Sequence, residues 1–455
     1  MNRYHDREQR IRKAGSEIYS AMAGEVPILF DTRRWMGRIM DWAMKDETFK
    51  SQLFRYIGVL PSLKTDADVV KLLKEYFTEE VNTPPIIRGG IERLGKGAFR
   101  TYVTARAIRA GVEALAKQFI AGKDPQDALK ALRSLRETGF ALSVDLLGEV
   151  VVSEREAEEY RERYLSLLDF MGAEVSGWKE DPLPGRDDRG AIPRFDISVK
   201  ISSLYSRLDP MDWEGSMEQT KKSLRPLFRK AIETGASICF DMEHSSFKDL
   251  IIAIFQSILE EFPDYPFAGI ALQAYLKETK ADLLKLIEWT RGEKRRITVR
   301  LVKGAYWDYE TVTSRQKGWP VPVFQSKEET DLAFEELTAL LLEHAEFLRP
   351  AIATHNIRSV SNAIAVADSL NLARDSFEFQ MLYGMGEPMG KVLRKKGYQV
   401  RVYTPVGELI PGMAYLIRRL LENTSNESFV RQFFAEKRSL EELIRAPEQK
   451  RAPSS

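Results

Sequence analysis

One segment near the C-terminus, AYLIRRLLEN, carries reactive side chains at helical spacing. Arg418, Arg419 and Glu422 lie three, four and seven residues after Tyr415, which places all four on roughly one side of a helix rich in Leu and Ile. Two inward-facing arginines need an anion, because burying unpaired positive charge is costly. A small carboxylate substrate or a phosphate-bearing cofactor would fit the planar guanidinium fork. The alternative is a solvated arginine pair neutralised by Glu422.

Further polar side chains stand at the ends of eight short apolar or β-branched runs. Charges inside such runs, as in SVKI, CFDM and VRLVK, are costly unless they pair with each other or with a ligand. For the charge of Lys200, a structural ion pair with a neighbour such as Asp241 is as good an explanation as a role in the chemistry. Taken alone, His355 could be a hydrogen-bonded core histidine, and Tyr275 and Tyr403 could simply pack inside the barrel. The full set is Glu149, Lys200, Asp241, Glu243, Gln273, Tyr275, Arg300, Lys303, Tyr306, Thr354, His355, Asn356, Gln380 and Tyr403, with the glycine turn YGMGE.

The elements that must position these residues alternate between strand and helix. The strand-like runs cover residues 139–147, 195–201, 237–242, 269–275, 297–304, 351–356, 376–382 and 399–406, each followed by a helix-like segment. Parallel strands need such crossovers, so the pattern favours an α/β fold, a (βα)8 TIM-like barrel. An open doubly wound sheet is the competing arrangement, but no GxGxxG motif opens the first unit. In a barrel the C-terminal strand ends share one mouth, where the polar residues would converge.

Three regions are predicted along the chain. Residues 1–98 have apolar positions at helical spacing and form an all-α N-terminal arm and domain, which Pro84, Pro85 and several glycines end. Residues 99–425 form the barrel. Residues 426–455 are expected to be a polar tail or linker.

Composition excludes several classes of protein. The 455 residues contain 68 Lys and Arg against 67 Asp and Glu, so no global basic field favours nucleic acid. A single cysteine, Cys239, excludes an intrachain disulfide and suits a reducing compartment. No apolar stretch is long enough to span a membrane and no secretory signal opens the chain, so we expect a cytoplasmic or at most peripheral protein. The four histidines lack metal-ligand spacing, and we predict no metal site. The candidate site has several cations and aromatic side chains but no nucleophile triad. A large anionic organic cofactor fits this set, because its phosphates would bind the cations and its ring system would lie against the aromatic walls.

Five motifs make a more specific resemblance. RLVKGAYWDYE (300–310), ATHN (353–356), FEFQMLYGMGEP (377–388), VYTPVG (402–407) and YLIRRLLEN (415–423) occur in this order at the expected barrel positions. Together they resemble the proline dehydrogenase domain of the bifunctional proline utilization A type. The similarity spans roughly residues 135–435, and the preceding helices resemble the arm and helices before that domain.

The resemblance implies a distorted barrel that holds FAD and oxidises L-proline to Δ1-pyrroline-5-carboxylate, the first step of proline catabolism. Hydride would pass from proline C5 to flavin N5, and electrons to a quinone. The resemblance is compatible with contact with the membrane surface and with an aldehyde dehydrogenase module in the same or a partner chain, and it leaves open whether this chain is a whole protein or the front part of a longer one. The family usually carries His where this chain has Tyr383 and Ala where it has Thr404. Relatives that prefer hydroxyproline carry Ser at the position of Tyr415, so the Tyr favours proline.

The resemblance also implies roles for individual residues. Arg418 and Arg419 would grip the substrate carboxylate, and Glu149 would pair with Arg418 to close the site. Lys200 and Asp241 would lie beside the proline amine, and Arg300 would face flavin N5. Leu382, Tyr403 and Tyr415 would enclose the pyrrolidine ring. The catalytic residues would be Lys200, Asp241, Arg300 and Tyr403. The cofactor contacts would be Asp241, Gln273, Arg300, Val302, Lys303, Gly304, Ala305, Trp307, Thr354, His355, Asn356, Gln380, Arg419 and Glu422.

Two other hypotheses account for part of the pattern. A barrel lyase or aldolase would use Lys200 or Lys303 as a Schiff-base amine. A non-enzymatic protein would use the N-terminal helices for docking and keep the barrel as a scaffold.

Overall fold

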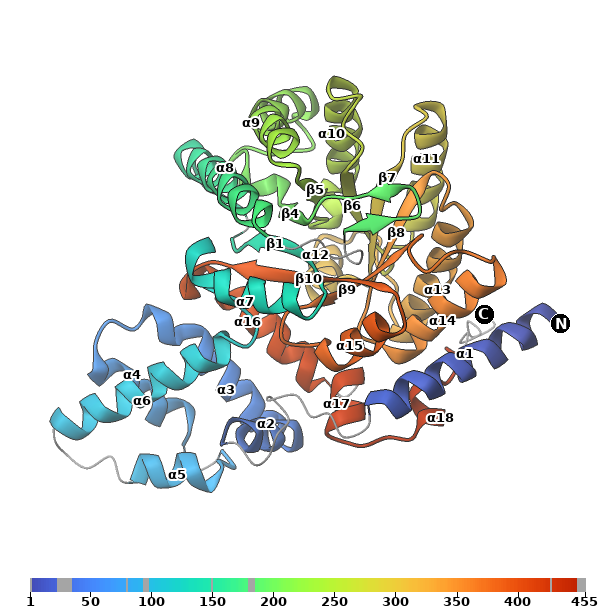
Figure 1. Cartoon of the computed structure of the whole chain (residues 1–455). Coiled ribbons are helices and arrows are strands. Elements are labelled where there is room, and N and C mark those ends of the chain that lie inside the picture. The colour runs from blue at the N-terminus through green and yellow to red at the C-terminus, as the bar shows by residue number, and fades with distance from the viewer. Residues whose placement is uncertain are drawn as a thin grey trace.

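The structure is a computed structural model that describes residues 2–22, 35–78, 81–92, 98–148, 150–178, 185–425 and 428–447. A barrel with a ring of helices forms most of it, and a group of N-terminal helices lies beside the barrel (Figure 1).

Eight parallel strands close into the barrel, in the order β1-β10-β9-β8-β7-β6-β5-β4, with β4 pairing back to β1. The strands are β1 (Ala141–Leu146), β4 (Phe195–Val199), β5 (Ser237–Phe240), β6 (Ala268–Gln273), β7 (Ile297–Val302), β8 (Leu348–Ala353), β9 (Glu378–Leu382) and β10 (Gln399–Val406). The closed order confirms the predicted barrel and rules out the open doubly wound sheet.

Helices follow the strands, and most of them cover the outside of the barrel (Figure 1). They are α8 (Glu154–Ser176), α9 (Trp213–Thr234), α10 (Lys248–Glu261), α11 (Thr279–Gly292), α12 (Trp307–Lys317), α13 (Lys327–Glu343), α14 (Ile357–Ser369) and α15 (Glu387–Lys395). Short 3₁₀ turns, η3 (Ile201–Ser203) and η4 (Ser245–Phe247), follow β4 and β5. Several helix starts are fixed by side-chain caps: Ser153 begins α8, and Ser326 forms a capping box with Glu329 at α13.

The barrel strands have an apolar outer face and a polar inner face. On β1, Leu142, Val144 and Leu146 alternate with Ser143 and Asp145, and all five are buried. Because successive side chains point to opposite faces, residues two apart share the interior. The inner face so defined carries Ser143 and Asp145 on β1, Asp196 and Ser198 on β4, Arg300 on β7, Glu378 and Gln380 on β9, and Gln399, Arg401 and Tyr403 on β10.

The N-terminal region is helical, as predicted. Its elements are α1 (Asn2–Met22), α2 (Trp35–Lys45), α3 (Glu47–Val59), η2 (Leu60–Ser62), α4 (Asp66–Tyr76), α5 (Pro85–Glu92), α6 (Ala98–Ala116) and α7 (Pro125–Glu137). Helix α1 lies apart from the others, against α14 and α15, while α2–α6 gather at the lower left of Figure 1. Helix α6 starts at the predicted boundary but packs against α4, so the division at residue 98 stays a prediction.

The helix that carries the two arginines, α16 (Leu409–Thr424), does not follow the regular pattern. It packs against α2, α3 and α6, whereas α7 contacts β1 and β10.

The segment after α16 differs from the expected polar tail. Two short helices, α17 (Phe429–Phe434) and α18 (Leu440–Leu443), contact each other and pack against α16 and α1, with Phe429, Phe434 and Leu443 buried. Residues 448–455 lie outside the described residues.

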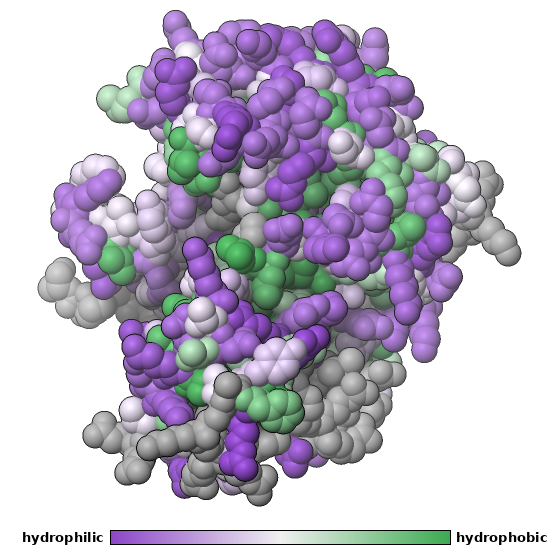
Figure 2. All heavy atoms as spheres, turned by 90° about the vertical axis from the view of Figure 1, so that its left-hand side faces the viewer, coloured by the Kyte–Doolittle hydropathy of each residue, from purple (hydrophilic) through white to green (hydrophobic). Residues whose placement is uncertain are grey.

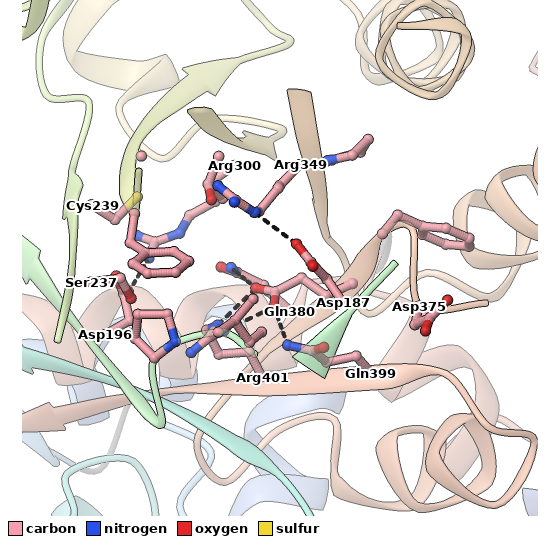
Figure 3. A pocket seen from close by; sticks show the side chains of 18 of the residues that line it. Asp187, Asp196, Ser237, Cys239, Arg300, Arg349, Asp375, Gln380, Gln399 and Arg401 are labelled. Carbon is pink, nitrogen blue, oxygen red and sulfur yellow. Dashed lines mark hydrogen bonds and ion pairs between the residues drawn. The ribbon is translucent and has the colours of Figure 1, made fainter. Parts of the chain in front are cut away.

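The N-terminal end of the barrel is closed by a small hairpin of β2 (Arg186–Asp187) and β3 (Gly190–Ala191). Asp187 accepts hydrogen bonds from Arg296 at 3.3 Å and from Arg349 at 2.8 Å. Between the hairpin and the strands lies a cavity of about 50 Å³ lined by charged side chains, among them Asp196, Arg300 and Arg401 (Figure 3). Such a volume holds a few water molecules, so this end of the barrel is too small for an amino acid or a cofactor.

Candidate active site

Asp241, which follows β5, is the centre of a buried cluster of charges inside the C-terminal half of the barrel. Its Oδ2 accepts hydrogen bonds from Lys200 Nζ at 3.2 Å and from the Tyr403 hydroxyl at 2.8 Å. Its Oδ1 accepts one from Arg300 at 2.8 Å. The Arg300 guanidinium also lies 5.2 Å from the centre of the Tyr403 ring. The structure therefore brings together the four residues predicted to be catalytic.

Four residues of this cluster were missed at the sequence level. Lys200 Nζ also bonds to Asp145, whose residue is 1% exposed. Arg300 donates further hydrogen bonds to Ser198 at 2.7 Å, Asp196 at 3.1 Å and Ser143 at 3.2 Å. The signal that could have identified them is the alternation in SVD and DISVK, which places polar residues on one face of each strand.

The two carboxylates that contact Lys200 differ in acidity. Burial raises the pKa of Asp145 to about 6, against the opposing charge of Lys200. Burial also acts to raise the pKa of Asp241, but the charges of Lys200 and Arg300 outweigh it and hold the pKa below its ordinary value. Burial disfavours the charge of Lys200, yet Asp145, Tyr403 and Asp241 together raise its pKa well above the ordinary value. Lys200 is therefore an ammonium group rather than a nucleophile, which argues against it as a Schiff-base amine.

The residues of α16 form the second part of the site. Arg419 pairs with Glu422 one turn later, and its guanidinium lies 5.1 Å from the centre of the Tyr415 ring. The Arg418 guanidinium lies 5.1 Å from the ring of Tyr306, which follows β7. The Arg419 side chain is only 11% exposed, while that of Glu422 is 43% exposed. Each of the two interpretations of this segment is therefore partly correct. Arg419 pairs with Glu422, as in a solvated ion pair, but its side chain is turned inward, as in a ligand-binding site.

Two buried polar atoms near these arginines have no hydrogen-bond partner in the described part of the chain. They are the Tyr415 hydroxyl and Nε of Arg419. Tyr415 also lies within electrostatic range of Asp145 and Lys200, so α16 and the charged cluster face each other across the mouth. Unsatisfied buried groups are costly, and a polar ligand would satisfy them.

His355 connects α16 to strand β9. Its Nε2 accepts a hydrogen bond from the Leu382 backbone N–H at 3.0 Å, and its Nδ1 lies 4.0 Å from a Glu422 carboxylate oxygen. Burial lowers the pKa of His355 to about 4, so the ring is neutral at pH 7. Leu382 pairs in register with Tyr403 on β10, at the same level of the barrel.

The other predicted cofactor contacts lie at the ends of β6, β7 and β8. The Gln273 amide donates to the Met242 and Glu243 carbonyls at 3.2 and 3.1 Å, and its buried Oε1 has no partner within the described ranges. Lys303 pairs with Asp331 of α13, and burial lowers the pKa of Lys303. The remaining residues of this group are Val302 at the end of β7, Gly304 and the exposed Ala305 after it, Trp307 at the start of α12, Thr354 after β8 and Asn356 at the N-cap of α14.

The structure does not place two of the predicted site residues at the mouth, one because it is not described and one because it lies elsewhere. Glu149 lies outside the described residues. Gln380 lies deeper in the barrel, where its Nε2 donates to Glu378 at 2.6 Å and the side chain lines the N-terminal cavity (Figure 3). Its contact with a cofactor stays a prediction.

Figure 2 shows the face of the molecule that lies on the left of Figure 1. Apolar side chains gather near the centre of this face between more hydrophilic surfaces. In the part of the chain that the structure describes, no group of three or more His, Cys, Asp or Glu is arranged to hold a metal ion. None of the described helices is long and apolar enough to cross a bilayer.

Comparison with known proteins gives matches over most of the chain. The family profile described as Proline dehydrogenase matches residues 128–432, and the one described as Proline utilization A N-terminal domain matches residues 8–119. A bifunctional protein PutA of Escherichia coli K12 is 29% identical over 428 residues, covering 90% of this chain and 31% of that protein. A proline dehydrogenase of Deinococcus radiodurans is 29% identical over 342 residues, covering 73% of this chain and 97% of that protein.

Solved structures agree with these matches. The crystal structure of proline utilization A from Bdellovibrio bacteriovorus, inactivated by N-propargylglycine, has a TM-score of 0.90 and 41% sequence identity. The match covers 98% of this chain and 45% of that one. The chain thus spans less than half the length of the bifunctional proteins that it resembles.

Proposed function

The chain belongs to the proline dehydrogenase family, and from this premise we propose that it oxidises L-proline to Δ1-pyrroline-5-carboxylate with FAD as its cofactor. The observation that carries the proposal is that two arginines on α16 lie opposite the carboxylate cluster around Asp241.

The two sides of the mouth offer different groups. On one side α16 carries Arg418 and Arg419, and the Arg419 guanidinium pairs with Glu422. On the other side the Asp145 and Asp241 carboxylates contact Lys200, and Asp241 also contacts Arg300. Arginines are suited to a carboxylate and the Asp241 carboxylate to an ammonium group, so together they suit an amino-acid zwitterion.

Each group has a definite task in this proposal. Arg418 and Arg419 bind the substrate carboxylate and so fix the position of the ring, and Tyr415 and Leu382 pack against it. Lys200 and Asp241 lie beside the substrate nitrogen and control its protonation. Glu149 would pair with Arg418 to close the site.

The residues at the ends of β6–β8 fit a large anionic cofactor. The Oε1 of Gln273, which has no partner among the described residues, can accept a hydrogen bond, and Thr354 and the N-terminal turns of α12 and α14 offer donors. Gly304 has a φ of +130°, and a Cβ there would lie 2.4 Å from the Tyr275 ring, so the chain can make this turn only with glycine.

These residues, with the other predicted contacts, would hold FAD. When bound, FAD supplies the N5 atom that accepts the hydride from proline C5, and hands the electrons to a quinone. Arg300 remains charged at all accessible pH values and offers a fixed positive charge beside the reacting atoms.

The wider context is also part of the proposal. Relatives named bifunctional are more than twice as long as this chain, so an aldehyde dehydrogenase module in the same or a partner chain would take the product onward. Because a quinone is lipophilic and lies in the membrane, the proposal includes a cytoplasmic protein that contacts the membrane surface.

An anaerobic absorbance titration tests the proposal. The purified protein should show a flavin spectrum, and L-proline should bleach the flavin band while D-proline should not. A protein that binds FAD but keeps its full absorbance in excess L-proline would refute the proposed activity.

A further inference from the structure

Asp145 lies deepest in a line of charged groups that leads inward from the mouth. The side chains become less exposed along this line, from 14% at Asp241 to 9% at Lys200 and 1% at Asp145. Lys200 Nζ contacts both carboxylates and lies between them. Lys200 therefore provides a path by which a proton from the mouth can reach Asp145.

The two carboxylates differ in how many donors they accept. Asp241 accepts hydrogen bonds from Lys200, Arg300 and Tyr403. Asp145 accepts one from Lys200 and interacts with Tyr403. A carboxylate with more cationic donors is the weaker base, so Asp145 is the more basic of the pair. The pKa values, raised to about 6 for Asp145 and lowered for Asp241, agree with this order.

The titratable groups that face Asp145 come from three surrounding elements and from the turns after β4 and β5. They are Lys200 after β4, Asp241 after β5, Tyr403 on β10, Tyr164 on α8 and Tyr415 on α16. Of these, only Lys200 is a cation. The described cluster as a whole carries one carboxylate more than it has cations, so it can take up one proton without acquiring an unpaired positive charge.

We propose that Asp145 takes the proton that the substrate ammonium group must lose before hydride can leave, with Lys200 as the intermediary. Lys200 passes one of its protons to the Asp145 carboxylate as it receives one from the substrate nitrogen. The substrate N–H bond breaks, the O–H bond of Asp145 forms, and Lys200 ends as the ammonium group that it was. No electrons are transferred in this step, and the freed lone pair on nitrogen then assists loss of the hydride from C5.

This inference rests on the proposed oxidation of proline. Asp145 acts through Lys200, so it is a positioning residue and not a group that touches substrate. A purely structural role would change stability or substrate affinity, whereas the proposed role changes the pH dependence of the reductive step.

The test uses the FAD-loaded protein and its Asp145→Asn variant, mixed anaerobically with saturating L-proline between pH 5 and 8.5. In the parent protein the rate of flavin bleaching should fall on the acid side with an apparent pKa near 6. Asp145→Asn should lose this acid limb and bleach at least about 100-fold more slowly at pH 8. Cyclopentanecarboxylate, which has no amine, should bind both proteins with dissociation constants within about twofold, because the α16 arginines are intact.

Asp196→Asn is the matched control. It removes a buried carboxylate of the same cluster that contacts Arg300 instead of Lys200, so the acid limb should remain. An Asp145→Asn protein that keeps the limb at the same pH would overturn the inference. If the Asp145→Asn variant fails to bind FAD, the pH profile of the parent protein is the test. A parent bleaching rate that is constant from pH 5 to 8 would also overturn the inference. A protein that L-proline does not bleach at any pH would refute the proposed activity instead.

Discussion

Replacing Arg419 by alanine should weaken the use of L-proline without unfolding the protein. The Arg419 side chain is 11% exposed, and its Nε has no partner within the described part of the chain, so its guanidinium is placed to form charge-assisted hydrogen bonds with a substrate carboxylate. Two such bonds contribute about 3 kcal/mol at the low end of their range, which corresponds to roughly a 150-fold loss of kcat/KM. The fold should survive, because the partner left behind, Glu422, has a side chain that is 43% exposed and can be solvated.

Steady-state rates with a dye acceptor measure the loss, and the flavin absorbance reports whether FAD remains bound. Pyrrolidine is the matched substrate, since it has the ring and amine of proline but no carboxylate. Arg419→Ala should leave kcat/KM for pyrrolidine nearly unchanged, and Arg419→Lys should lose less than alanine does because it keeps the charge without the fork. Equal loss for both substrates, or no loss for L-proline, would refute the carboxylate assignment.

Three further substitutions test separate parts of the structure. Tyr415→Ser should raise the ratio of kcat/KM for hydroxyproline to that for proline, because the buried ring fills the space that a ring hydroxyl needs. Gly304→Ala should lower the free energy of unfolding by about 3 kcal/mol, measured by urea denaturation, because the new Cβ would meet the Tyr275 ring at a positive φ. His355→Gln should reduce the loss of stability between pH 6.5 and 4. The folded pKa of about 4 lies below that of a free histidine, so the unfolded chain takes up more protons as the pH falls, and up to about 3 kcal/mol is lost.

Two of these have a matched control variant. Tyr415→Phe keeps the ring and should keep the preference for proline; a Ser variant with the same preference would contradict the steric reason. Gly318→Ala also has a positive φ, of +67°, but open space around it, so it should cost only about 1 kcal/mol. Equal costs at the two glycines would mean that contact with Tyr275 is unimportant. The reference for His355→Gln is the parent protein, and a His355→Gln protein with the parent's acid slope would contradict the burial argument.

The barrel could be predicted from sequence because its strand-like runs alternate with helical segments and carry charges that need partners. Lys200, Asp241, Arg300 and Tyr403 were identified in this way, and they meet around Asp241. The same reasoning passed over Asp145, because a single acid within the run ALSVDLL looks like part of an apolar strand until its alternation with outward leucine and valine is considered.

Other features depend on tertiary contacts that no local pattern contains. The approach of His355 to Glu422 joins residues 67 positions apart on different elements, and Gln380 lies in the N-terminal cavity because of its depth along β9. The packed segment after residue 427 was expected to be a polar tail, since its few aromatics, Phe429, Phe433 and Phe434, are spread among charged residues.

The central claim is that this mouth binds the proline zwitterion and removes a hydride from C5. Single-turnover bleaching of the flavin by L-proline and by L-proline deuterated at C5, with the product quantified, tests it most directly. The account predicts a slower rate with the deuterated substrate and one Δ1-pyrroline-5-carboxylate formed per flavin reduced. Equal rates with no pyrroline product would contradict it.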